Sequence, residues 1–206
     1  MTDFSTLQSD EVLRKYIEQI VDEKLNQKLL FFQNELLGLQ KTVQKIQKAM
    51  PKDQVSILVS SHELDNLLPA FIVATGAASF GMEVSMFFTL WGITALKTKN
   101  IFTGKSIAEK MLTVMLPSDA NDRGISRLNM MGMGKMMMKG MMKAENVATL
   151  PELIELAGEL GVKMTACQMT MGIMGISREE LRTDIGYGGV AAYIEDASES
   201  KITLFI

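Results

Sequence analysis

The most distinctive chemical group in this sequence is the thiol of Cys167, the only cysteine among 206 residues. It ends a short run of strand-forming residues, 162–167, that follows a glycine. We expect a loop next, and then a helix opened by the capping box at Ser177. Open α/β sheets bind ligands at the carboxyl ends of their strands, where a thiol can be nucleophilic. The alternative is a buried structural cysteine, which behaves as a small apolar side chain.

Other polar residues fall at the ends of neighbouring predicted strands or directly beside the thiol. Because the carboxyl ends of parallel strands meet at one edge of a sheet, these residues are candidates to line a pocket around Cys167. His62, the only histidine, either polarises the thiol or lies in solvent at the start of a helix. Trp91 fits a pocket wall and the core equally well. The candidates are Ser60, Ser61, His62, Thr89, Trp91, Gly92, Thr165, Gln168 and Met169.

The elements that would position these residues alternate between strands and helices. This alternation predicts an α/β fold, a mostly parallel sheet with helices on both faces. The strand order does not follow from it. We expect 186–189 to form a tight turn, which is also a weak candidate for binding an anion. The predicted strands are 54–60, 83–89, 162–167 and 201–206, the predicted helices are 63–79, 151–160 and about 188–197, and 107–115 fits either.

Residues 10–50 predict one long helix that ends at Pro51. Its apolar positions from Leu25 to Met50 are spaced alternately by four and three residues, which is the heptad seam of a coiled coil. Upstream, apolar residues step by fours, as they do in a stutter. We therefore assign 1–50 to a helical coiled-coil arm that makes a homo-oligomer, and 53–206 to the α/β domain. The alternative is a helix packed on its own domain.

The segment 111–143 is unusually rich in methionine and carries five lysine or arginine residues from 123 to 143. Its glycines argue against a rigid helix. Methionine is flexible and suits surfaces that repack around different partners. Three interpretations stay open: a mobile lid or oligomer contact, a cationic face on a membrane surface, and a site for Cu(I). One histidine and one cysteine give the copper site little support, so we predict no metal.

Composition excludes several classes of protein. With 47% hydrophobic residues and a net charge of −3, the chain is globular and has no overall attraction for nucleic acid. A single cysteine fits a reducing compartment, and the acidic N-terminus does not resemble a signal peptide, so we expect a cytoplasmic protein. The apolar stretch 64–96 breaks into pieces that are short for a bilayer span. We find no motif for a nucleotide, cofactor or catalytic triad.

The chain resembles the DsrE/DsrF-like superfamily of sulfur-relay proteins, in its single-domain peroxiredoxin-like branch. The resemblance covers residues 54–206 and leaves out the coiled-coil arm. It implies a flavodoxin-like three-layer fold, oligomeric assembly, and a cysteine that carries sulfur as a persulfide, which by position is Cys167. The pieces that carry it are 60–65, Met86-Phe-Phe-Thr-Leu-Trp-Gly92, 129–143, 150–161 and Ala166-Cys-Gln-Met-Thr-Met-Gly-Ile-Met-Gly-Ile176.

Two functional hypotheses follow. The first is a sulfurtransferase-like sulfur carrier that works through Cys167 with donor and acceptor proteins. The second is a non-catalytic scaffold, oligomerised by residues 10–50, whose methionine-rich surface docks a partner protein or a membrane. A peroxidase that closes an intramolecular disulfide is excluded, because the chain has no second thiol.

Overall fold

The computed structural model describes residues 4–120, 124–125 and 133–206. The chain divides into two compact units, residues 1–50 and 51–206. The first unit is a single helix, α1 (Phe4–Ala49), that by its residue count is about 70 Å long. From Leu25 to Met50 the seam side chains are 49–62% exposed. The long N-terminal helix is therefore confirmed, and its apolar seam is left uncovered within this unit.

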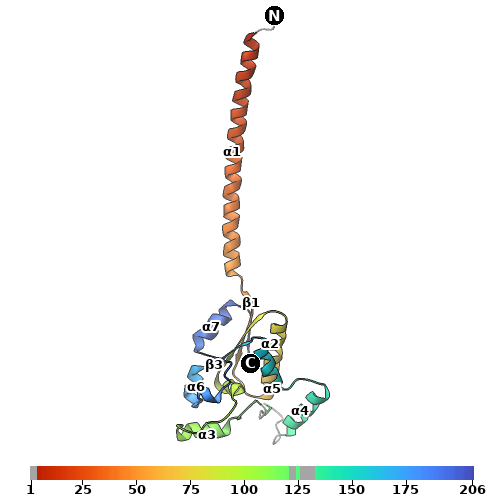
Figure 1. Cartoon of the computed structure of the whole chain (residues 1–206), viewed down its shortest axis with the longest axis vertical. Helices are drawn as coiled ribbons and strands as arrows, with labels where there is room; N and C mark the ends of the chain where they lie inside the picture. The colour runs from red at the N-terminus through yellow and green to blue at the C-terminus, as the bar shows by residue number, and fades with distance from the viewer. Residues whose placement is uncertain (1–3, 121–123, 126–132) are drawn as a thin grey trace. The chain divides into compact units, whose positions relative to one another are not determined.

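The second unit is built on a five-stranded sheet in which every pair of neighbours is parallel (Figure 1). The strand order is β4-β3-β2-β1-β5. The α/β class predicted from the alternating elements is thus confirmed. The strands are β1 (Lys52–Val59), β2 (Glu83–Phe88), β3 (Lys163–Cys167), β4 (Gly186–Gly188) and β5 (Ser200–Phe205).

The connections supply the outer layers of the fold. Thr149 caps α5 together with Glu152, whose carboxylate accepts the Thr149 N–H at 2.7 Å. The helices are α2 (Leu64–Ser79), α3 (Ile107–Met115), α4 (Met133–Ala144), α5 (Leu150–Glu159), α6 (Gln168–Met174) and α7 (Val190–Glu199), with 3-10 turns η1 (Leu90–Leu96) and η3 (Arg178–Glu180).

Two adjacent phenylalanines show how the sheet is covered on both faces. Successive strand residues point to opposite faces. Phe88 stacks on Phe71 of α2, with ring centroids 5.9 Å apart, and Phe87 contacts Tyr193 of α7 at 5.7 Å. Figure 1 shows α2 and α5 on one side of the sheet and α7 on the other. The result is the expected three-layer arrangement, with the main core between the sheet and the α2–α5 layer.

Three local predictions were wrong. The segment after Cys167 is the helix α6 and not a loop, and 186–188 form the edge strand β4 and not a tight turn. The capping box at Ser177 opens only the short turn η3. The helix stops there because Leu181 forms an antiparallel bridge with Lys97 and the Arg182 N–H donates to the Leu96 carbonyl. Tertiary hydrogen bonds outweigh the local preference for a helix.

The methionine-rich segment also differs from the expectation. Its last part, α4, is helical despite Gly134 and Gly140. Each glycine costs about 1 kcal/mol, but methionine, lysine and a final alanine fill the remaining positions and are good helix formers. The Asn146 backbone adopts a left-handed conformation and the Val147 N–H donates to the Met142 carbonyl, which ends the helix. The stretches 121–123 and 126–132 of this segment lie outside the described residues.

Candidate functional site

Cys167 is the last residue of β3 and the N-cap of α6, so the strand delivers its thiol directly to the first turn of a helix. The residue is only 3% exposed and forms no disulfide. At an N-cap, the side chain faces backbone N–H groups that have no partner within the helix. The backbone N–H groups of Met169 and Thr170 favour the thiolate of Cys167 and lower its pKa.

A cluster of hydroxyls completes the surroundings of the thiol. The Thr170 Oγ1 lies 3.1 Å from the Thr89 Oγ1, and both side chains favour the thiolate of Cys167. Thr170 Oγ1 also accepts the Leu90 N–H at 3.1 Å. Each hydroxyl has a single proton, so one threonine donates to the other and only the second can donate to the sulfur. The carboxyl ends of β2 and β3 therefore meet at the thiol.

Leu90 holds this cluster in a conformation that non-glycine residues seldom adopt. Its φ is 45°, in the left-handed region. Such a backbone costs about 1–3 kcal/mol and persists where the surroundings fix it. Here it places the Leu90 N–H against Thr170. The strained residue is thus the one whose N–H holds the Thr170 hydroxyl in place beside the sulfur.

These contacts change the acidity of the thiol. Burial raises the pKa of Cys167, but the hydrogen bonds from Thr170, Thr89 and the Met169 amide together outweigh it. The net effect lowers the pKa below the ordinary value for cysteine. A thiolate is the nucleophilic form, so the site favours the reactive state of Cys167.

We predict that Thr170→Val raises the pKa of Cys167, because valine keeps the shape of threonine but removes a hydroxyl that stabilises the thiolate. The measurement is the rate of alkylation by iodoacetamide as a function of pH, and the single cysteine makes it specific for this site. Thr75→Val is the matched control. Thr75 is another buried threonine, but it lies in α2, where its hydroxyl donates to the Phe71 carbonyl at 2.8 Å. Equal profiles for the two variants would remove Thr170 from the site.

The structure brings together only some of the predicted pocket residues. Thr89 and Met169 lower the pKa of the thiol, one through its hydroxyl and the other through its amide. Met169 has a side chain that is 67% exposed, and Gln168 is exposed beside it. Thr165 packs toward β4, where a Cβ at Gly188 would come within 3.3 Å of its methyl group. The expectation that Thr165 hydrogen-bonds near the sulfur stays a prediction.

The residues after β1 are engaged elsewhere. The Ser60 hydroxyl donates to the Ile206 carbonyl at 3.2 Å, and Ser61 is half-buried. The His62 N–H donates to the Glu63 carboxylate at 3.2 Å, and its Nδ1 lies 3.7 Å from the same carboxylate. These contacts connect His62 to the start of α2.

Trp91 and Gly92 lie in η1, the turn that follows β2. Trp91 is 46% exposed, so it belongs to the surface and not to the core. Gly92 donates its N–H to the carbonyls of Ser60 and Thr89, and a Cβ there would lie 2.3 Å from the Val59 carbonyl oxygen. Gly92 thus allows η1 to pack closely on the end of β1, and this contact positions Thr89.

Two residues of the site were not predicted from the sequence. Thr170 sits three residues after Cys167, at the N3 position of α6, and is 1% exposed. The spacing Cys-x-x-Thr was a usable pattern, because an N-cap residue faces N2 and N3. Leu90 left no pattern in the sequence, since its role comes from a backbone angle.

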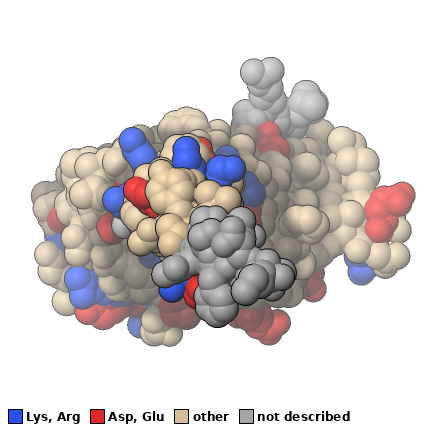
Figure 2. Space-filling model, turned by 90° about the horizontal axis from the view of Figure 1, so that it is seen from above, with Lys and Arg blue, Asp and Glu red and all other residues tan. Residues whose placement is uncertain are grey.

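Charged residues of both signs are mixed on the surface of the protein. Figure 2 shows lysine and arginine interspersed with aspartate and glutamate between broad uncharged areas on the face that it presents. Within the described ranges, no three His, Cys, Asp or Glu side chains are grouped to hold a metal ion. No helix among the described residues is both long and apolar enough to cross a bilayer. The groups that lower the pKa of the thiol belong to Thr89, which directly follows β2, and to α6 and not to α4, so a methionine lid over Cys167 stays a prediction.

Comparison with known proteins assigns the family. The DsrE/DsrF/DrsH-like family matches residues 51–205. The chain belongs to this family. It is 45% identical over 154 residues to the uncharacterized protein YrkE of Bacillus subtilis, covering 74% of this chain and 96% of that protein. It is 36% identical over 159 residues to the sulfur carrier protein DsrE2 of Allochromatium vinosum, covering 76% of this chain and all of DsrE2.

Among solved structures, the chain is similar to the ychN protein from E. coli, with a TM-score of 0.46 and 11% identity over 76% of this chain and 100% of that one. Membership in the family supports a role in sulfur relay and agrees with the resemblance seen in the sequence. The α1 helix lies outside the family match.

Proposed function

We propose that this protein carries sulfane sulfur as a persulfide on Cys167. The observation that carries the proposal is the buried thiol at the N-cap of α6, whose pKa is lowered by the side chains of Thr170 and Thr89 and by the amides of Thr170 and Met169. The relationship to a protein named sulfur carrier DsrE2 supports it. A reducing compartment, such as the cytoplasm, would keep the thiol available.

The chemistry is an exchange between sulfur atoms. The Cys167 thiolate attacks the outer sulfur of a donor persulfide, a new S–S bond forms, and the bond to the donor's own sulfur breaks. The donor leaves as a thiolate, so no net oxidation occurs. An acceptor thiolate then attacks the outer sulfur and Cys167 leaves. A lowered pKa increases the thiolate fraction and makes Cys167 a better leaving group in the second step.

The surroundings of the thiol fit a carrier. A side chain that is 3% exposed is sheltered from peroxide and other oxidants in solution. The surface above it is apolar: Leu90, Trp91, Met169 and Ile173 are 46–67% exposed. Met169 is unbranched and can move aside at low cost. We propose that donor and acceptor proteins dock on this surface and thereby gain access to Cys167.

The test is intact-mass measurement after incubation with a sulfane-sulfur donor such as polysulfide. We expect the wild-type protein to gain the mass of one sulfur atom, and to lose it on treatment with a thiol reductant. Cys167→Ser should gain nothing. Thr75→Val, which changes a buried threonine of α2 outside the site, should load like the wild type. A wild-type protein that stays unmodified while its thiol can be alkylated would contradict the proposal.

A second candidate function is favoured by the uncovered seam of α1. In this alternative, the protein is a homo-oligomeric scaffold held by the helix, and the exposed methionines of α4 dock a partner protein or a membrane surface. Partner binding that persists in Cys167→Ser would support the scaffold over the carrier.

A further inference from the structure

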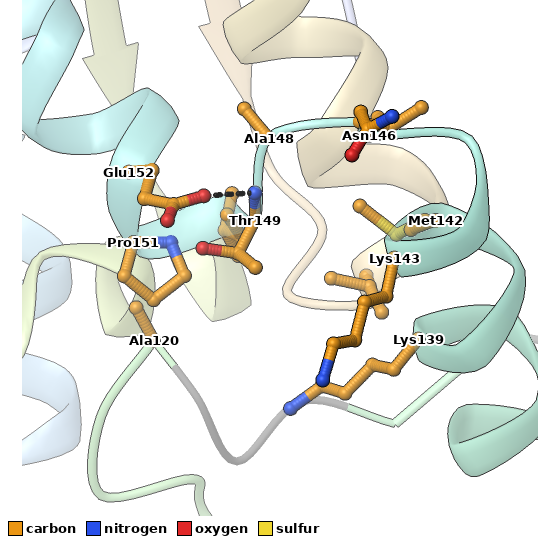
Figure 3. A pocket seen from close by; sticks show the side chains of 12 residues that line it. Ala120, Lys139, Met142, Lys143, Asn146, Ala148, Thr149, Pro151 and Glu152 are labelled. Carbon is orange, nitrogen blue, oxygen red and sulfur yellow. Dashed lines mark hydrogen bonds between the residues drawn. The ribbon is translucent and has the colours of Figure 1, made fainter.

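The cavity between α4 and α5, shown in Figure 3, measures about 670 Å³, but two of its charged groups are already engaged. The Glu152 carboxylate accepts the Thr149 N–H at 2.7 Å, and the Lys139 side chain also has an interaction partner. As far as the structure describes the chain, no buried polar atom without a partner lines this cavity. A ligand would therefore compete there with contacts that the protein already makes.

A second cavity, of about 490 Å³, lies at the amino edge of the sheet, where β1, β2 and β3 begin. Lys163, the first residue of β3, forms part of its wall. Cys167 is the last residue of the same strand, about 13 Å further along it. Sites for small molecules usually measure about 300–1,000 Å³. The cavity is thus separate from the sulfur site and large enough for a small ligand.

The hydroxyl of Ser85, in the wall of this second cavity, lacks a partner. Ser85 is 5% exposed, and its Oγ has no hydrogen-bond partner among the described residues. It lies directly across from Lys163 in the sheet, on the face that α7 covers, because Lys163 bonds to Asp196 of that helix. Burying a hydroxyl without a partner is unfavourable. A ligand that hydrogen-bonds to Ser85 would remove this penalty.

The charged side chains of the cavity include one more carboxylate than ammonium groups. Lys163 Nζ lies 2.9 Å from both carboxylate oxygens of Asp196, and Lys52 is paired with Glu199. The third carboxylate is that of Glu83, the first residue of β2, which attracts Lys52 from farther away. The excess charge is therefore negative, and it favours a cation over an anion.

The strand β2 fixes the distance between the carboxylate and the hydroxyl. Glu83 and Ser85 are two residues apart, so they share one face of the strand at a spacing of about 7 Å. Part of the remaining wall is apolar and open to water: Leu160 is 39% exposed and Met82 is only partly buried. A hydrocarbon chain placed against these two side chains would gain burial.

We propose that this cavity binds a small aliphatic amine that also carries a neutral hydrogen-bonding group. The ammonium group lies against Glu83, the neutral group bonds to the Ser85 hydroxyl, and the hydrocarbon chain contacts Met82 and Leu160. A neutral group suits Ser85 better than a second ammonium group, because Lys163 lies across from it. This site goes beyond sulfur transfer and does not depend on it.

The test is titration of the full-length protein with 5-amino-1-pentanol, followed by NMR of the ligand. We expect saturable 1:1 binding, and binding at least fivefold weaker for 1,5-pentanediol, which lacks the charge, and for pentylamine, which lacks the hydroxyl. Glu83→Gln should weaken the amino alcohol at least fivefold. Ser85→Ala should weaken the amino alcohol to the level of pentylamine and leave pentylamine itself unchanged.

Ser56→Ala is the matched control. Ser56 is 1% exposed, its Oγ also has no hydrogen-bond partner among the described residues, and it lies across from Ser85 on β1. It does not form part of the cavity wall. Each variant removes an unpaired buried hydroxyl, so both should resist urea at least as well as the wild type. Only Ser85→Ala should lose affinity for the amino alcohol, which separates binding from a structural role.

Several outcomes would overturn the proposal. Amino alcohol that fails to bind, binds no better than 1,5-pentanediol, or loses the same affinity in Ser56→Ala as in Ser85→Ala would contradict it. So would equal binding to Ser85→Ala and the wild type, because that result leaves the hydroxyl to a water molecule. Cys167→Ser should bind the amino alcohol like the wild type, and this variant separates failure of the cavity from failure of the sulfur-carrier proposal.

Discussion

Glu180→Gln is expected to lower the free energy of unfolding by about 3–5 kcal/mol, because it leaves two buried lysines without their carboxylate. The Glu180 side chain is 0% exposed, and those of Lys97 and Lys105 are 1% and 7% exposed. Lys105 Nζ lies 2.8 Å from both carboxylate oxygens, and Lys97 Nζ lies 3.8 Å from one. Removing one partner of a buried ion pair costs far more than removing an exposed pair.

Backbone groups add to this expected loss. The Ile101 N–H donates to Glu180 Oε1 at 3.0 Å and the Ser177 N–H donates to Oε2 at 2.9 Å. Thr98 donates its N–H to the Glu180 carbonyl. One carboxylate therefore joins the segment that follows η1 to the segment that follows α6. Since η1 and α6 carry the groups around Cys167, the loss of Glu180 should loosen the sulfur site as well as the fold.

The same contact gives a pH dependence with a definite sign. Burial raises the pKa of Glu180, but Lys105 and the backbone N–H groups of Ile101 and Ser177 outweigh it and lower the pKa below the ordinary value for glutamate. A carboxylate with a lowered pKa stabilises the fold above its unfolded-state pKa, about 4.3, and loses that contribution as the pH falls through its folded-state pKa. The stability difference between wild type and Glu180→Gln should therefore shrink in acid.

The measurement is urea unfolding at several pH values. Glu159→Gln, at an exposed position in α5, is the matched control and should change stability by less than about 0.5 kcal/mol. If the free energy of unfolding of Glu180→Gln lies within 1 kcal/mol of the wild-type value at neutral pH, the buried cluster does not stabilise the fold.

The same residue shows what sequence reasoning can and cannot reach. The capping box of Ser177 and Glu180 was visible in the sequence, and both residues indeed lie in a helical turn. The partners of Glu180, which lie 75 and 83 positions earlier at Lys105 and Lys97, were not visible, because buried ion pairs depend on tertiary contacts. Local patterns therefore located the turn but overestimated its length.

The strands were predictable for a related reason. β1, β2 and β3 are short apolar runs bounded by glycine, proline or polar residues, and the structure places each within two residues of its predicted bounds. Their order in the sheet needed contacts that no run of residues encodes. The same holds for the site. Cys167 and Thr89 could be predicted because they lie at strand ends. Thr170 and Leu90 could not, because their roles depend on a helix and on a backbone angle that the sequence did not predict.

Deletion of residues 1–50 is expected to lower the number of subunits in the assembly in solution, because α1 should hold copies of the chain together. In heptad terms, Leu29, Leu36 and Val43 occupy one seam position, and Leu25, Phe32, Leu39 and Ile46 occupy the other. All are at least 49% exposed. An isolated helix with such a face is marginal in water, and burial against a second copy would stabilise it.

The residues beside the seam favour association between identical helices. The second seam position, which holds Leu25, Phe32, Leu39 and Ile46, is position d of the heptad. The residues that directly follow it are Asn26, Gln33, Gln40 and Gln47. All four are uncharged, so identical helices meet without repulsion there. Leu30, Phe31 and Leu37 lie outside the two seam positions and are 54–61% exposed. This wider apolar face can contact more than one neighbouring helix, so it allows an assembly of more than two helices.

Light scattering coupled to size-exclusion chromatography measures the mass, and a double substitution separates the seam from the helix as a whole. Leu36→Glu with Leu39→Glu places charges in the seam and should dissociate the assembly as the deletion does. Lys41→Glu with Lys45→Glu changes two charges outside the seam and should leave the mass unchanged. The α/β unit can still self-associate after the deletion, so a smaller oligomer is compatible with the prediction. A full-length protein that is already monomeric, or an assembly with an unchanged number of subunits after deletion, would show that α1 does not join copies of this chain.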